Sequence, residues 1–437
     1  MGIIRILICL AAIVLPVTGC TTGEEINARY EKELLRKDFR QFRNHIEKES
    51  AFLFADIEMI DELLDETEKQ IKDTMSELEF YRLLNPVVAR LRCGHSFLSV
   101  SKSFQQNMAE SVKYFPLSVR ISDDKLFVIE DRSTEKNSCG AQIMSINQID
   151  SRTIIKKIMS NMSSDGDDVS RHRYDAERHF ASMYYLFVDE SQAFTVELLD
   201  DESLYEVTLD GISDATLAKT PMTIMFDTAS SPWSLRIDDT YAHAVIPTFA
   251  MDDVRRFERE LKIFFKTVKE RKTGSLIVDL RGNYGGSVRP VVTLFSYLID
   301  RPLRFFSNDN PFYLFRWKRE IKKADYAFDG DLYVLMDEGC FSMTGFLLSL
   351  LKEHDIGTLY GVKSSGGNKC SDASRNRVLR NTGLRLRYST DIFQSAVESI
   401  PQGEGVQSDI VVNMTIADYL SLNDPVLNAV LERIGSD

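Results

Sequence analysis

The chain has 437 residues, of which 43% are hydrophobic and 27% are charged, a balance typical of a globular protein with two or three domains. Its formal net charge of −13 excludes nucleic-acid binding through a broadly basic surface. After the N-terminus no apolar run reaches the 18 residues that a membrane-spanning helix needs. The six histidines are scattered and the cysteines lack metal-ligand spacing, so we expect no metal and no cofactor.

The N-terminus has the pattern of an export signal. Arg5 precedes the apolar run Ile6–Val17, and the segment Val17-Thr18-Gly19-Cys20 follows. This arrangement resembles a bacterial signal peptide with a lipoprotein cleavage box. The resemblance implies that residues 1–19 are removed and that acyl chains on Cys20 anchor the protein in the bacterial cell envelope, on the periplasmic or cell-surface side.

Residues 20–95 are predicted to form an N-terminal helical domain. Apolar residues recur at steps of four, three and four, which marks one face of a helix: Leu35, Phe39, Phe42 and Ile46. Thr74 and Glu77 have the spacing of a capping box before a further helix. Asn85-Pro86 predicts that a new helix starts there.

Residues 96–215 are predicted to form a β-rich region with two hairpins and one helix. The hairpins are Leu117–Ile121 with Lys125–Glu130, and Phe194–Leu199 with Leu204–Leu209; the helix is Ser151–Met159. Between them, the polar segment Asn161–Asp175 is predicted to be a loop.

Part of this region loosely resembles the core of a PDZ domain. The segment Gly140–Asn147 carries that likeness, although Ala141 and Gln148 replace the usual aspartate and glycine. A generic small β-domain is the alternative. A PDZ-like module would bind a polypeptide tail by adding it to the sheet as a strand.

Residues 220–437 are predicted to form a β/α core with parallel strands, because buried strands alternate with amphipathic helices. The expected strands are Ala242–Ile246, Ser275–Leu280 and Leu332–Met336; the expected helices are Val254–Val268, Val288–Leu298 and Phe346–Lys352.

Two segments of this core carry the strongest signal. In Ser275–Gly286 a continuous apolar run leads into glycines, and in Tyr333–Phe346 a similar run delivers Ser342 to the start of a helix. Glycines after a buried strand let backbone N–H groups approach a ligand closely. The free N–H groups and dipole of a helix N-terminus favour developing negative charge. This arrangement suits a serine nucleophile beside an oxyanion hole.

In this order and spacing the two segments resemble the signature of the C-terminal processing (tail-specific) serine peptidases. The resemblance implies an α+β multidomain protein whose catalytic core is a crotonase/ClpP-like β/α superhelix. It also implies that Ser342 is the nucleophile and that peptides or unfolded polypeptides are the substrates. Backbone N–H groups of Gly285 or Gly286 and of Met343 would form the oxyanion hole.

The general base is predicted to be His95. One branch of the family uses a lysine, but the matching position here is Gly367, and Lys363 and Lys369 are out of register. The segment Cys93–Phe97 instead resembles the Gly-His-(Ser/Thr) context of the branch that includes the tricorn core and retinoid-binding-protein modules. An imidazole with an ordinary pKa of about 6.5 accepts a proton near neutral pH, so we expect activity to rise between about pH 6 and 7.

The carboxylate that orients this histidine is predicted to be Glu404. In the tricorn-like pattern a glutamate stands three residues before the segment equivalent to Gly405–Asp409, where this chain has Gln402. Asp409 and Gln402 stay open as alternatives. Because this position departs from the pattern, a weak or inactive protein that binds peptides or apolar ligands on the same fold is the alternative function.

Disulfide pairing is open at this stage. Four cysteines follow Cys20, which allows three complete pairings, and a bond between Cys340 and Cys370 beside the predicted site is one possibility.

Overall fold

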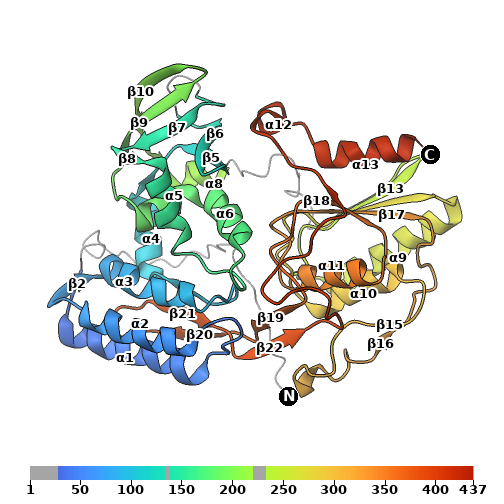
Figure 1. Ribbon diagram of the computed structural model, residues 1–437, viewed down its shortest axis with the longest axis horizontal. Helices are drawn as coiled ribbons and strands as arrows, with labels where there is room; N and C mark the ends of the chain where they lie inside the picture. Colours follow the sequence, from blue (N-terminus) through green and yellow to red (C-terminus); the bar gives the residue numbers. More distant parts are fainter. Residues whose placement is uncertain (1–27, 134–137, 220–232, 437) are drawn as a thin grey trace.

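The computed structural model describes residues 28–133, 138–219 and 233–436, which form a mixed α+β protein with several sheets (Figure 1). The N-terminal helices and a β-rich layer lie on one side of the view, and a β/α core lies on the other. The predicted signal peptide and Cys20 fall outside the described residues. Among the described helices, none is both long enough and apolar enough to cross a bilayer.

The first helices confirm the periodicity of the sequence. They are α1 (Lys32–Glu49), α2 (Ile57–Lys69) and α3 (Glu77–Arg90). The four apolar residues predicted to share a face of α1 are all fully buried. Burial of such side chains contributes roughly 1.5–3 kcal/mol each, which outweighs the weak intrinsic stability of an isolated helix.

Two details predicted at the start of and within α3 are wrong. The capping box is formed by Ser76 and Glu79 instead of Thr74 and Glu77, because Thr74–Ser76 is strand β2, paired with β1 (Arg29–Glu31). The helix also runs through Pro86 without restarting. Proline removes one intrahelical hydrogen bond, but burial of the neighbouring Leu84, Val87 and Val88 keeps the segment helical.

A segment from the far end of the chain packs against these helices. Strands β20 (Arg375–Val378) and β21 (Arg385–Tyr388) form a sheet with β3 (Phe97–Ser99). Leu386 and Tyr388 of β21, and Leu384 just before it, belong to the same hydrophobic cluster as α1 and α3. The predicted unit of residues 220–437 therefore contributes strands to the packing of the N-terminal region.

The middle of the chain forms a sheet with the order β10-β9-β7-β6-β5. Both predicted hairpins and the predicted helix are present, within one or two residues: β5 (Leu117–Ser122), β6 (Lys125–Asp131), β7 (Gln142–Ile146), α5 (Ser151–Met159), β9 (Ala193–Asp200) and β10 (Ser203–Asp210).

The predicted loop Asn161–Asp175 is only partly a loop. Its second half enters helix α6 (Val169–Arg178), which Asp168 caps by accepting a hydrogen bond from the Ser170 N–H. The polar composition hid this helix, since its buried residues include Arg171, which pairs with Asp175 of the same helix, and Glu177, which pairs with Arg120 of β5.

The remaining short elements connect these layers. They are α4 (Lys102–Ser111), β4 (Lys113–Tyr114), β8 (Ile149–Asp150), α7 (Phe180–Phe187), β11 (Ile212–Ser213), α8 (Asp214–Lys219), β15 (Leu303–Arg304), η1 (Phe312–Leu314), β16 (Glu320–Ile321), β19 (Lys369–Asp372), β22 (Asp391–Gln394) and α12 (Ile416–Ser421).

The β/α core is built on a six-stranded sheet with the order β12-β13-β14-β17-β18-β23. Its strands are β12 (Ser234–Ile237), β13 (Tyr241–Val245), β14 (Ser275–Asp279), β17 (Asp331–Met336), β18 (Thr358–Gly361) and β23 (Ile410–Val411). All neighbours pair in parallel except β12 with β13, which confirms the predicted parallel core.

Helices cover both faces of this sheet. They are α9 (Val254–Arg271), α10 (Val288–Leu298), α11 (Met343–Glu353) and α13 (Pro425–Gly435). Val426 and Val430 of α13 pack with Ile277, Tyr333 and Leu335 on one face, whereas α9, α10 and α11 pack on the other. Parallel pairing brings the carboxyl ends of β14 and β17 to the same edge, where the two predicted motifs begin.

We expect Asp38→Ala to destabilise the protein by on the order of 3 kcal/mol, because it leaves buried donors unpaired. The fully buried Asp38 carboxylate of α1 accepts hydrogen bonds from the N–H groups of Asn381 (3.0 Å) and Thr382 (2.8 Å), in the turn between β20 and β21. A lower urea midpoint by circular dichroism would show this. Arg36→Ala on the exposed face of the same helix is the control, and equal midpoints for both variants would contradict the expectation.

Candidate active site

Ser342 lies at a strained turn between β17 and α11. Its backbone has φ 55° and ψ −123°, a region that residues other than glycine rarely adopt and that is found where a nucleophile is held at a sharp strand-to-helix turn. The Asp337 carboxylate fixes the turn by accepting hydrogen bonds from the N–H groups of Gly339 (2.9 Å) and Gly282 (2.8 Å). The second bond also ties this turn to the glycine turn after β14.

His95 reaches Ser342 across 247 residues of sequence. Its Nε2 lies 3.0 Å from the Ser342 Oγ, and both residues are only 7% exposed. The ring packs against Phe341 with the centroids 4.8 Å apart. Gly94 allows this approach, because a Cβ there would lie 2.6 Å from the Phe341 ring. A hydroxyl and an imidazole in this contact are the pair that nucleophilic catalysis by serine requires.

Two carboxylates flank the His95 ring. Asp372, at the end of β19, places Oδ2 3.8 Å from Nε2. Asp165 is buried and accepts a hydrogen bond of 2.8 Å from the Gly94 N–H. Asp165, Cys93 and His95 each bring a potential metal-ligand atom within 4.8 Å of the others. The Nδ1 of His95 has no hydrogen-bond partner among the described residues.

These neighbours raise the pKa of His95. Burial alone lowers it, but the charge of Asp372, the Cys93 thiol and the charge of Asp165 outweigh burial and raise it to about 9. We therefore expect His95 to titrate at a higher pH than the range of about 6 to 7 expected for an ordinary imidazole.

The predicted orienting residues lie elsewhere. The Glu404 side chain is exposed and has no hydrogen bond or ion pair within the described chain, and Gln402 is exposed as well. Asp409 accepts a hydrogen bond from the Leu359 N–H (2.8 Å) and pairs with Lys352, a structural role at the edge of the core. The structure gives Glu404 no contact with His95, so its role rests on the sequence pattern alone.

The carboxylates that do flank the ring were missed in the sequence. Asp165 lies in the polar run Ser163–Asp168, which has the composition of a linker, and Asp372 lies in a short strand with no motif around it. The only local sign of Asp165 was a cluster of three aspartates within four residues, with a glycine among them. Nothing in the local sequence marks the second.

Of the three N–H groups predicted to form the oxyanion hole, the structure leaves two available. Gly285 is required for close packing, because a Cβ there would lie 2.8 Å from the Met343 N, and its φ is 90°. Its own N–H, however, donates to the Asn283 Oδ1 at 2.8 Å, so Gly285 is a positioning residue. The N–H groups of Gly286 and Met343 have no hydrogen-bond partner within the described residues and remain as donors for an oxyanion.

Lysines and cysteines near the site make other interactions. The Lys363 Nζ pairs with Asp168 at 2.9 Å, and among the described residues no lysine hydrogen-bonds to Ser342. Cys340 and Cys370 are both buried and free, so the disulfide considered between them does not form in this structure.

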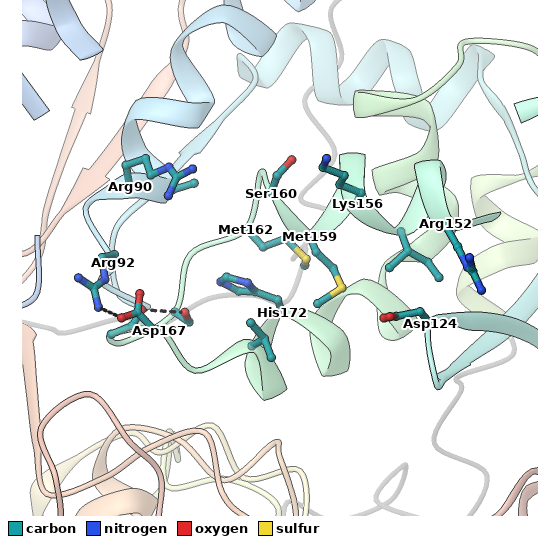
Figure 2. Close-up of a pocket in the computed structure, with 15 residues that line it drawn as sticks. Arg90, Arg92, Asp124, Arg152, Lys156, Met159, Ser160, Met162, Asp167 and His172 are labelled. Atoms are coloured by element: carbon teal, nitrogen blue, oxygen red, sulfur yellow. Dashed lines mark hydrogen bonds and ion pairs between the residues drawn. The ribbon is translucent and has the colours of Figure 1, made fainter. Parts of the chain in front are cut away.

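A pocket of about 480 Å³ lies beside this site, between the end of α3 and helices α5 and α6 (Figure 2). Arg92 and Asp167 pair at its edge, next to the segments that carry His95 and Asp165. Neither His95 nor Ser342 lines this pocket. It is therefore separate from the serine–histidine pair.

The chain is similar to known proteins in sequence pattern and in fold. The family model for peptidase family S41 matches residues 241–412. The crystal structure of mature CPAF is similar with a TM-score of 0.66 and 14% identity, covering 93% of this chain and 99% of that chain. A CPAF mutant is similar with a TM-score of 0.68 and 13% identity over the same shares. At these identities the likeness shows a shared fold. No curated protein matches the chain.

We expect NMR titration of the His95 ring to give a midpoint well above the ordinary value of about 6.5, because nearby negative charge stabilises the imidazolium. Asp372→Asn removes one charge and should move the midpoint to lower pH. Asp355→Asn, at an exposed position, should leave it unchanged. A midpoint at or below 6.5 in the unmodified protein would refute the electrostatic argument.

Proposed function

Because residues 241–412 place the chain in peptidase family S41 as a serine-type peptidase, we propose that it hydrolyses peptide bonds through an acyl-enzyme on Ser342 with His95 as the base. The observation that carries the proposal is the contact of 3.0 Å between the His95 Nε2 and the Ser342 Oγ at a strained turn. The predicted branch with a histidine base is the one that this contact supports.

The first half-reaction follows from these positions. His95 accepts the hydroxyl proton of Ser342 as the Oγ attacks the carbonyl carbon of the substrate. The N–H groups of Gly286 and Met343 donate to the oxyanion that forms, and removal of one such donor typically costs 10²- to 10³-fold in rate. Asp372 and Asp165 stabilise the imidazolium. His95 then gives the proton to the leaving amine, and the acyl-enzyme remains.

The second half-reaction repeats these roles with water. His95 accepts a proton from the water that attacks the acyl carbon, and it returns that proton to the Ser342 Oγ when the ester bond breaks. The raised pKa of His95 makes the imidazole a stronger base but reduces the neutral fraction at pH 7. The proposed peptidase should therefore work faster as the pH rises toward about 9.

The substrate class is a peptide or an unfolded polypeptide tail. We assign substrate capture to the PDZ-like sheet, where β10 is an edge strand whose residues Ser203 and Leu204 are exposed. Such an edge accepts an extended peptide as a further strand. In this proposal the N-terminal helical domain supplies His95, and the ClpP-like β/α core supplies Ser342.

The proposed location rests on the sequence of the N-terminus. We propose that Cys20 is acylated and that the peptidase acts from the bacterial cell envelope, on its periplasmic or cell-surface side. The support is the apolar run after Arg5 and the cleavage box that ends at Cys20. More than one acyl chain gives stable anchoring, whereas a single chain binds marginally.

Ser342→Ala should abolish labelling by a fluorophosphonate and cleavage of casein, because the variant lacks the attacking oxygen. His95→Ala should reduce kcat by about 10³-fold or more, since the hydroxyl then has no base. Casein cleavage by each variant is measured at saturating substrate across pH 6 to 10.

The controls separate these roles from general damage to the fold. His354→Ala, Lys363→Ala and Lys369→Ala should keep most of the activity. Full turnover by Ser342→Ala would refute the nucleophile, and a folded but inactive lysine variant would favour the other branch. A chain that is folded yet unlabelled in its unmodified form would favour the alternative of a binding protein.

Cys20→Ala should release the protein from membranes into the soluble fraction and prevent incorporation of labelled palmitate. The physical reason is that acyl chains partition into the bilayer with about 0.8 kcal/mol per buried methylene group. Fractionation and autoradiography of both forms measure this. No palmitate in the unmodified protein would leave a plain signal peptide as the explanation of the N-terminus.

A further inference from the structure

An exposed aromatic tip projects from the core between β15 and β16. Phe312, Tyr313 and Phe315 are 84%, 55% and 50% exposed, whereas Leu314 between them is buried and holds the segment to the core. The Phe312 and Phe315 rings stack with their centroids 5.8 Å apart. Large apolar side chains clustered on a surface usually mark a site of interaction with another protein or a membrane.

Hydrogen bonds connect the tip to neighbouring segments of the chain. Asn310 donates from Nδ2 to the Gln394 carbonyl at 2.6 Å, and Lys318 donates from Nζ to the Asn308 carbonyl at 2.6 Å. Tyr313 donates from its hydroxyl to the Asp391 carboxylate at 2.8 Å. The aromatic rings are therefore exposed on a segment whose position is fixed by hydrogen bonds.

Basic side chains follow the aromatic residues directly. Between Phe312 and Lys323 the chain has five basic residues and one acidic residue, Glu320, in a protein whose net charge is −13. Four of the five are exposed and have no hydrogen bond or ion pair within the described chain: Arg316, Arg319, Lys322 and Lys323. The charge of this segment is thus opposite to that of the protein as a whole.

We propose that this aromatic and basic tip, residues 312–323, binds the surface of an anionic lipid bilayer. Aromatic rings are favoured at the level of the lipid headgroups, and each nearby Lys or Arg is attracted to an anionic leaflet. The negative charge elsewhere on the protein keeps the remaining surface away from the same leaflet. In Figure 1 β15 and β16 lie at the opposite end of the core from α13, so the contact would orient the core on the membrane.

The proposal does not depend on the peptidase activity. If Cys20 is acylated, the tip provides a second, weaker contact that sets the orientation of a protein already held at the membrane. One lipid anchor combined with a basic patch is a common way to obtain stable membrane association.

Trp317 offers a local test, because the chain has only one other tryptophan, the buried Trp233. Tryptophan fluorescence of the full chain is measured with vesicles of brominated phosphatidylglycerol or brominated phosphatidylcholine. We expect quenching with phosphatidylglycerol only, reduced several-fold by 0.5 M salt because attraction to the surface is screened. The quenching should disappear in Trp317→Phe, which shows that it arises at the tip even if the N-terminus also binds the vesicles.

Matched variants complete the test. Phe312→Ser with Phe315→Ser, and separately Lys322→Glu with Lys323→Glu, should each reduce the quenching at least threefold. Ile263→Ser with Lys262→Glu, an exposed pair on α9, should leave it unchanged. Vesicle-bound protein with unquenched Trp317, or equal quenching by both lipids, would overturn the proposal. Self-association that Phe312→Ser abolishes, without quenching, would assign the tip to a second copy of the chain instead.

Discussion

The buried amide of Asn283 joins the pieces of the active site. Its Oδ1 accepts hydrogen bonds from the Gly285 N–H and the Thr344 hydroxyl, both at 2.8 Å, and its Nδ2 donates to the Ile246 carbonyl at 2.7 Å. One side chain thus connects the end of β13, the glycine turn after β14 and the first turn of α11. Because an unpaired amide in this position would cost a few kcal/mol, the three segments are held in one arrangement.

That arrangement explains why the strained turn at Ser342 persists. Parallel pairing sets β14 beside β17, and the Phe341 N–H donates to the Asn283 carbonyl at 3.1 Å. A conformation that costs 1–3 kcal/mol survives only where the surrounding contacts determine it. In the proposed mechanism the gain is a Ser342 hydroxyl directed at its base, His95, with the N–H groups of Gly286 and Met343 free to bind the substrate oxyanion.

The charges around His95 depend on contacts between three segments that lie outside the six-stranded sheet. His95 comes from the turn after α3, Asp165 from the loop before α6, and Asp372 from β19. Strands β20 and β21 follow β19 and pack into the N-terminal hydrophobic cluster, which fixes the helical region against the core. The position of His95 relative to Ser342 is therefore a property of packing between regions.

The sequence alone determined the local features. Helix α1, both hairpins, α5, α10 and the parallel strands follow from the periodicity of apolar residues, and Ser342 and His95 were found because their flanking residues match a family pattern. The tertiary structure alone decided the continuity of α3 through Pro86, the existence of α6, and the presence of Asp165 and Asp372 beside His95. Each of these depends on contacts between residues far apart in the chain, and periodicity and spacing report only on neighbours along it.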